Sequence, residues 1–163
     1  MPIVVHLADE KSRAAILRSG LRPGRDAPGV FFMPALQSHF VSHQWIRELR
    51  RGGARVLIGV YLKLADDHPV RAGRYNREHR AMTLAESIKE LRSIDDPRGY
   101  ELYSQRSIPA SSIHRIKVMP ATTGWRYMPD AHGRPPCPCP ACMRRGDFGR
   151  ARLLAKERAA SIT

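Results

Sequence analysis

The sequence predicts an α+β domain, and the order of its expected elements indicates this class. Several short strand candidates alternate irregularly with helix candidates, instead of following the regular strand–helix order of a doubly wound parallel sheet. The chain also lacks a glycine-rich phosphate loop of the P-loop or Rossmann kind. Its 163 residues, of which 42% are hydrophobic, suit one ordinary domain with one core.

The N-terminal part predicts a strand, a helix and a second strand. The apolar run at 3–7 indicates a buried strand. A helix follows over 8–21, with Asp9 as its N-cap and Gly20 as its stop. The apolar face of this helix consists of Ala14, Ile16 and Leu17. Two Pro-Gly signals then mark a loop, and the apolar, aromatic residues 30–33 predict the second strand.

The middle of the chain predicts a second helix and the longest strand. Residues 35–53 predict the helix, which Gly52 and Gly53 end. The inner face of this helix consists of Leu36, Phe40, Trp45 and Leu49. The apolar run at 54–64 is typical of a central strand. Residues 65–81 are polar, so we expect a loop there.

A third helix and two further strands follow. Thr83 is the expected N-cap of a helix over 82–94, and Glu86 would complete a capping box with it. The alternating segment 100–108 predicts a strand. Segment 111–121 predicts another, after which the composition changes.

The composition after residue 120 is rich in Pro, Gly, Cys and Arg. We therefore divide the chain into a core over 1–120 and an extension over 121–163. All three cysteines lie close together in the extension, which is not a disulfide framework and indicates a metal site. The pattern H-x4-C-x-C-x2-C can supply four ligands to a structural zinc. The predicted zinc ligands are His132, Cys137, Cys139 and Cys142. His114 or Asp130 could replace the histidine, and three exposed thiols without metal are the plain alternative.

The chain is strongly basic, with 28 Lys and Arg against 15 Asp and Glu and a formal net charge of +13. Such a charge attracts polyanions by counterion release, and arginine makes bidentate phosphate contacts. The plain alternative is that the basic segments 47–55 and 143–158 are solvated helix faces. Neither an apolar run of membrane-spanning length nor a signal-peptide pattern occurs, so we expect a cytoplasmic protein with no membrane partner.

Three candidate site elements lie in or beside predicted strands that are far apart in the sequence. They are His6, the run 29–32 and Glu101. Strand ends that a fold brings together often build a binding site. Taken singly, each residue has a plainer interpretation, as a satisfied core histidine, as core aromatics or as a solvated glutamate.

The order of four short motifs strengthens this interpretation. "VVHLAD", "AAILRSGL", "GVFFMPALQSHFVSHQW" and "YELYSQRSIPASSI" follow one another over residues 3–118. In order and spacing they resemble the ADP-ribosyltransferase superfamily, on the branch with a His–aromatic–Glu signature. The segment "FFMPALQSH" also resembles the DarT-like toxins, which ADP-ribosylate single-stranded DNA. The N-terminal segment "VVHLADEKSRAAILRSGL" is equally similar to the RNA 2′-phosphotransferases, which share the fold.

The resemblance implies a split β-sheet core that binds NAD as its substrate between the two parts of the sheet. It implies that His6 bonds the adenosine ribose and that the backbone around Leu7 pairs with the nicotinamide carboxamide. Phe31 would stack on the nicotinamide, without the hydroxyl of the tyrosine that many members have there. Ser38 or Ser42 would help to hold the nicotinamide.

The resemblance also implies the chemistry. Glu101 and His6 would be the catalytic residues, with Glu101 bonding the 2′-hydroxyl of the nicotinamide ribose and stabilising the charge that develops as nicotinamide leaves. The expected function is ADP-ribosyl transfer to a macromolecule, with DNA or RNA favoured and a toxin or defence role. Such a toxin would have an antitoxin protein as a further partner.

Two alternatives to this function stay open. The first is an RNA 2′-phosphotransferase, which relies on an early histidine and several arginines, without a late catalytic glutamate. The arginines available for that role are Arg13, Arg18, Arg22 and Arg25. The second is a non-enzymatic nucleic-acid-binding protein in which the zinc knuckle and the basic C-terminal helix bind the polymer.

Overall fold

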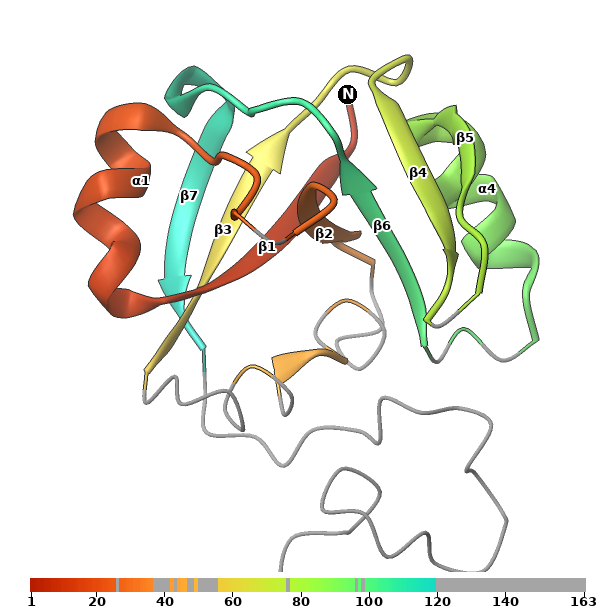
Figure 1. Ribbon diagram of the computed structural model, residues 1–163, viewed down its shortest axis with the longest axis horizontal. Helices are drawn as coiled ribbons and strands as arrows, with labels where there is room; N and C mark the ends of the chain where they lie inside the picture. Colours follow the sequence, from red (N-terminus) through yellow and green to blue (C-terminus); the bar gives the residue numbers. More distant parts are fainter. Residues whose placement is uncertain are drawn as a thin grey trace, which may run out of the picture.

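In the part of the chain that the structure describes, α-helices accompany a seven-stranded antiparallel sheet, so the predicted α+β class is confirmed. The computed structural model describes residues 1–25, 27–36, 42, 44–46, 49, 56–75, 77–95, 97 and 99–119. The strand order is β5-β4-β6-β2-β1-β3-β7 (Figure 1). The strands are β1 (Ile3–Asp9), β2 (Val30–Pro34), β3 (Leu57–Lys63), β4 (Pro69–Arg74), β5 (Arg80–Thr83), β6 (Tyr100–Ser104) and β7 (Ile113–Val118). The helices are α1 (Arg13–Ser19) and α4 (Leu84–Ser93), with 3-10 turns η1 (Glu10–Ser12) and η2 (Ala110–Ser112).

The two central strands of the sheet, β1 and β2, are joined over a very short length. Their register includes only the pairs Val4 with Pro34 and Val5 with Met33. By contrast, β1 pairs with β3 along all seven of its residues, Ile3–Asp9. The sheet therefore divides into a β1 half (β1, β3, β7) and a β2 half (β2, β6, β4, β5). We call the place where the β1–β2 pairing stops, after Val5, the fork.

Side chains of the β2 half alternate between two faces. Phe32 of β2 and Leu102 of β6 are paired and buried, and they point to the core side. Phe31 pairs with Tyr103, and both point to the opposite face, which Glu101 shares because it lies two residues from Tyr103. In Figure 1, α4 lies beside β4 and β5, and α1 lies at the other end of the sheet. One face of β6 thus carries a glutamate beside aromatic rings.

The start of α4 confirms the predicted capping box. The Thr83 hydroxyl accepts a hydrogen bond from the Glu86 backbone N–H at 3.3 Å, and the Glu86 carboxylate accepts from the Thr83 N–H at 2.7 Å. These bonds satisfy donors that the first turn of a helix leaves without partners. Leu84 and Leu91 of α4 are buried in the core.

The first helix follows its predicted signals only in part. Asp9 does act as an N-cap, and its carboxylate accepts from the Lys11 N–H at 2.9 Å. It caps the 3-10 turn η1, however, and α1 begins at Arg13. Ile16 is buried, whereas Leu17 is 51% exposed, so the apolar face is narrower than predicted.

The segment 65–81, which the polar composition predicted to be a loop, contains β4 and the first half of β5. That prediction was wrong. The two strands pair as an antiparallel hairpin, with Val70 opposite Met82 and Ala72 opposite Arg80. Only Val70 and Ala72 of β4 are buried, because the other residues of the strand belong to its more exposed face or its ends. Two apolar residues among charged ones give a weak alternation signal.

Several predicted features lie wholly or mostly outside the described residues. Of the helix predicted over 35–53, the described residues are 35, 36, 42, 44–46 and 49. The whole extension 121–163 lies outside, together with its predicted zinc ligands and basic helix.

The strand predicted over 54–64 is found as β3. It lies between β1 and β7, inside the sheet but not at its middle. Among the described residues, no helix has the length and apolar character needed to cross a membrane.

Replacing Gly20 with alanine is expected to lower the free energy of unfolding by about 2–4 kcal/mol. Gly20 ends α1 with φ +74°, and an added Cβ would collide with the carbonyl oxygen of Ile108. Leu21 bonds that same carbonyl at 2.8 Å, so the two segments cannot easily move apart. Gly24→Ala is the matched control, because its Cβ would make only an ordinary contact with Ala27 at 3.5 Å. Denaturant unfolding that gave both variants the same stability would contradict this packing.

Candidate functional site

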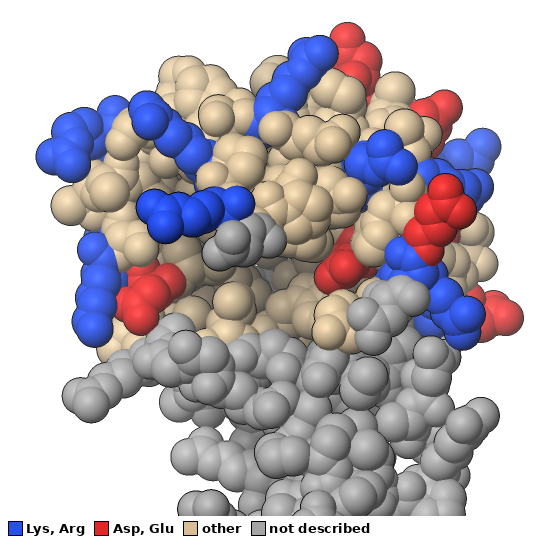
Figure 2. All heavy atoms as spheres, in the orientation of Figure 1, with Lys and Arg blue, Asp and Glu red and all other residues tan. Residues whose placement is uncertain are grey.

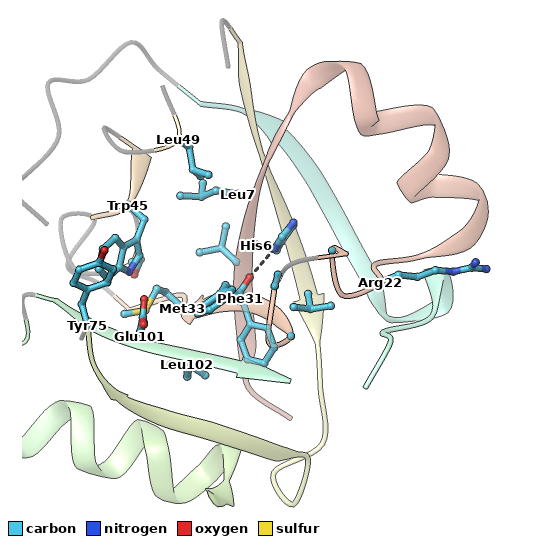
Figure 3. Close-up of a pocket in the computed structure, with 17 residues that line it drawn as sticks. His6, Leu7, Arg22, Phe31, Met33, Trp45, Leu49, Tyr75, Glu101 and Leu102 are labelled. Atoms are coloured by element: carbon cyan, nitrogen blue, oxygen red, sulfur yellow. Dashed lines mark hydrogen bonds between the residues drawn. The ribbon is translucent and has the colours of Figure 1, made fainter. Parts of the chain in front are cut away.

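A cavity of about 440 Å³ opens at the fork, and residues from β1, β2 and β6 line it (Figure 3). His6, Phe31 and Glu101, which the sequence singled out from three separate segments, all belong to its lining. Leu7 lines it as well. The cavity lies where the hydrogen-bonded pairing of β1 with β2 ends, because the two strands are no longer held together beyond Val5.

His6 bridges the two halves of the sheet just beyond the last β1–β2 pair. Its Nδ1 lies 2.6 Å from the carbonyl oxygen of Phe31 (dashed in Figure 3). A carbonyl oxygen only accepts, so Nδ1 carries the proton and donates. Burial lowers the pKa of His6, so the ring is neutral near pH 7 and its Nε2 is an acceptor. His6 thus replaces a ladder bond at the fork and leaves one ring nitrogen able to accept from a ligand.

Glu101 is a carboxyl group held in a largely dry place. Its side chain is only 15% exposed, and this burial raises its pKa to about 7. Its partner in the ladder is Gly73 of β4, which has no side chain to fill the space beside it. A Cβ on Gly73 would lie 2.8 Å from the carbonyl oxygen of Glu78, so the turn after β4 also needs this glycine. A carboxyl group with such a pKa can bond a hydroxyl or take up a proton near neutrality.

Aromatic rings form much of the cavity wall. Trp45 and Tyr75 lie with ring centroids 5.8 Å apart and an interplanar angle of 44°. Phe31 contacts Tyr103 with a centroid distance of 5.0 Å. In Figure 3, Trp45, Tyr75 and Glu101 are seen at one side of the cavity and His6 at the other. Such walls suit a flat, partly apolar ligand ring.

Gln44 fixes the segment that carries Trp45. Its side-chain oxygen accepts from the Gly99 N–H at 2.7 Å, and its Nε2 donates to the Tyr100 carbonyl at 3.3 Å. Gln44 is 2% exposed, and buried hydrogen bonds of this kind are costly to break. The residue before Trp45 is therefore tied to the start of β6, next to Glu101.

The remaining predicted site residues are placed as follows. Ser42 lines the cavity, is 1% exposed and accepts a bond from the Leu36 N–H at 2.9 Å through its hydroxyl. Ser38 lies outside the described residues. The predicted zinc ligands His132, Cys137, Cys139 and Cys142 lie outside them too, as does the alternative Asp130. The other alternative, His114, is an exposed residue of β7. Within the described ranges, no cluster of three or more His, Cys, Asp or Glu side chains could hold a metal ion.

Among the described residues, several basic side chains lie around the site, and Arg22 belongs to its lining. The arginines of α1 and the loop after it are exposed, and they are Arg13, Arg18, Arg22 and Arg25. Arg22 borders the cavity, but Figure 3 shows its guanidinium pointing away from it. On the face drawn in Figure 2, Lys and Arg side chains lie over the α1 region and at the β4–β5 side, where Asp and Glu side chains lie among them. This distribution suits contact with a polyanion outside the cavity.

Sequence reasoning missed three aromatic or titratable residues of this region. Trp45 was expected on the inner face of a helix, whereas it lines the cavity. Tyr75 and His79 follow β4, in the segment taken for a loop. The weak alternation of Val70 and Ala72 was the signal that could have revealed the hairpin.

Comparison with protein-family models, with curated proteins and with solved structures gives no match for this chain. The site combines a neutral histidine acceptor, aromatic walls and a buried carboxyl group in one cavity.

Proposed function

We propose that this chain is an NAD-dependent ADP-ribosyltransferase that modifies a macromolecule, with nucleic acid as the favoured acceptor. The observation that carries the proposal is the meeting of His6, Phe31 and Glu101 in one cavity at the fork. These are the residues through which the sequence resembles the superfamily. The forked antiparallel sheet also supports the finer fold expectation, a split sheet of the ADP-ribosyltransferase kind.

The cavity fits the nicotinamide half of NAD in size and chemistry. Its volume of about 440 Å³ lies within the range usual for small-molecule sites. The Phe31 ring offers a stacking surface for a flat pyridine ring. The buried Glu101 offers an acceptor for a ribose hydroxyl.

Each residue then has a defined task. Bound NAD would supply the ADP-ribosyl group, with nicotinamide as the leaving group. His6 would accept a hydrogen bond from the adenosine ribose through Nε2, and Leu7 would pair its backbone with the carboxamide. Glu101, once ionised, would hold the 2′-hydroxyl of the nicotinamide ribose and stabilise the positive charge that develops on the sugar. The same carboxylate would take the proton that the acceptor releases.

Nucleic acid is favoured as acceptor because the charge suits it. The net charge of +13 and the exposed arginines around the cavity would attract a phosphate backbone. A structural zinc held by the extension through His132, Cys137, Cys139 and Cys142 remains part of the proposal, as do a toxin role and an antitoxin partner.

The 2′-phosphotransferase alternative has less support. That activity needs cationic side chains directed at a phosphate in the site, whereas the Arg22 guanidinium points out of the cavity. It also gives no task to the buried carboxyl group of Glu101.

The proposal is tested by incubating the protein with NAD labelled in its adenylate part, together with single-stranded DNA, RNA or a protein mixture. We expect nicotinamide release and covalent label on one of these polymers. Removal of phosphate from an RNA that carries a 2′-phosphate would instead support the phosphotransferase. Binding of polymer without any nicotinamide release would support the non-enzymatic alternative.

A further inference from the structure

The side chains of His79 and Glu101 lie against each other at the edge of the candidate site. His79 Nε2 is 3.1 Å from Glu101 Oε1, and each side chain is 15% exposed. His79 can come this close to Glu101 because the residue that pairs with Glu101 in the β4–β6 ladder is Gly73, which has no side chain. A Cβ on Gly73 would lie 3.2 Å from His79 Cα, so only glycine lets the β4–β5 turn bring the imidazole this close.

The acceptor character of the two facing groups indicates a shared proton, because they lie 3.1 Å apart without completing a hydrogen bond. His79 bonds the Arg77 backbone in a way that favours the protonated ring, so the ring donates there. Nε2 is buried and makes no complete hydrogen bond among the described residues, which assigns the Arg77 bond to Nδ1. In a neutral ring Nε2 is then an acceptor, and it lies beside a carboxylate that also only accepts. Two such lone pairs at 3.1 Å repel unless one group carries a proton.

The surroundings keep this pair from separating into two full charges. Burial lowers the pKa of His79, and the positive charge of Arg71 on β4 lowers it further. Burial raises the pKa of Glu101 to about 7. Arg71 also donates to the His79 carbonyl at 2.8 Å, and the Tyr103 ring of β6 lies 5.5 Å from the His79 ring. Tyr75, which lines the same cavity as Glu101, and Arg77 belong to the turn between β4 and β5.

We propose that His79 is a positioning residue that shares one proton with Glu101 and sets the pH at which Glu101 becomes an active carboxylate. Its catalytic consequence rests on the proposed transferase function. In that reaction the acceptor atom bonds the ribose carbon as nicotinamide leaves with the electrons of the broken bond. The proton released by the acceptor enters the Glu101–His79 pair, whose net charge changes from one negative charge to zero.

The shared proton is tested in the free protein by NMR titration of the Glu101 carboxyl carbon and the His79 ring. In the wild type we expect both groups to report the same titration step near neutrality. In His79→Gln, the amide donates to the carboxylate, so the Glu101 midpoint should fall by at least about one pH unit. His114→Gln, on the exposed strand β7, is the matched control and should leave it in place.

The reciprocal variant protects the test against a local folding defect. In Glu101→Gln the amide donates to Nε2, so the protonation step of His79 should move to lower pH. Independent titrations in the wild type, or an unchanged Glu101 midpoint in a folded His79→Gln, would overturn the shared proton. These titrations need no NAD, so their outcome is separate from that of the transfer assay. If transfer is observed, the acid limb of its pH profile should shift with the Glu101 midpoint in His79→Gln.

Discussion

Replacing Glu101 with glutamine is expected to reduce ADP-ribosyl transfer by about a thousandfold while NAD affinity stays within about threefold. Glutamine keeps an oxygen that can accept a bond from a ribose hydroxyl, so ground-state binding survives. It carries no negative charge, so the positive charge that develops on the sugar is no longer stabilised. Nor can it take the proton of the acceptor. Rates from the labelled-NAD assay, compared with affinities from calorimetry, separate the two effects.

Asp95→Asn is the matched control for this loss, because it makes the same carboxylate-to-amide change at an exposed residue that does not line the cavity. It should transfer at the wild-type rate. Full activity in Glu101→Gln would show that this carboxylate is not the catalytic group, and the reaction would then have to be assigned to other residues of the cavity.

The same substitution should stabilise the protein at alkaline pH. The pKa of Glu101 is raised from 4.5 to about 7 in the folded state. Folding is therefore favoured by this group below pH 4.5, and the benefit is lost as the pH rises through about 7. The free energy of unfolding of Glu101→Gln, relative to wild type, should grow by about 3 kcal/mol between pH 4 and pH 9.

Urea unfolding at a series of pH values measures this difference. Titrating groups away from Glu101 are common to both proteins and cancel from the comparison, whereas the contribution of His79, 3.1 Å from Glu101, is measured separately by its own NMR titration. Asp95→Asn, at an exposed position outside the cavity lining, is the matched control for this comparison. A difference between Glu101→Gln and wild type that stays constant from pH 4 to pH 9 would mean that Glu101 is not buried as described. The combination of lost activity and gained alkaline stability is what a functional buried carboxylate requires.

Local signals in the sequence predicted much of the fold. The capping box of Thr83 and Glu86 involves neighbouring residues, so its sequence pattern suffices to place the start of α4. The stop at Gly20 is equally local, since only that residue must adopt a positive φ. Leu17 was predicted to belong to the buried face of the first helix, but it is exposed. Its burial depends on which elements pack against α1, and no local sequence pattern shows this.

The candidate site was predictable as a set of strand residues but not as an arrangement. His6, Phe31 and Glu101 each lie on a strand with a clear apolar signal, and the structure brings them to one cavity. His79 escaped notice because its position depends on the β4–β5 hairpin, whose strands carry few buried residues. Its approach to Glu101 also needs the space that Gly73 leaves, a relation between three segments that no local pattern encodes.

Calorimetric titration of the purified protein with NAD measures whether the cavity at the fork binds this dinucleotide. The wild type and the control His114→Ala should bind alike. His6→Ala should bind at least tenfold more weakly, because it loses both the ribose acceptor and the bond to Phe31 that holds the fork. Phe31→Leu, which keeps that backbone bond, should also weaken binding through lost stacking. No heat of binding from folded wild type, or undiminished affinity in both cavity variants, would mean that NAD does not bind in this cavity.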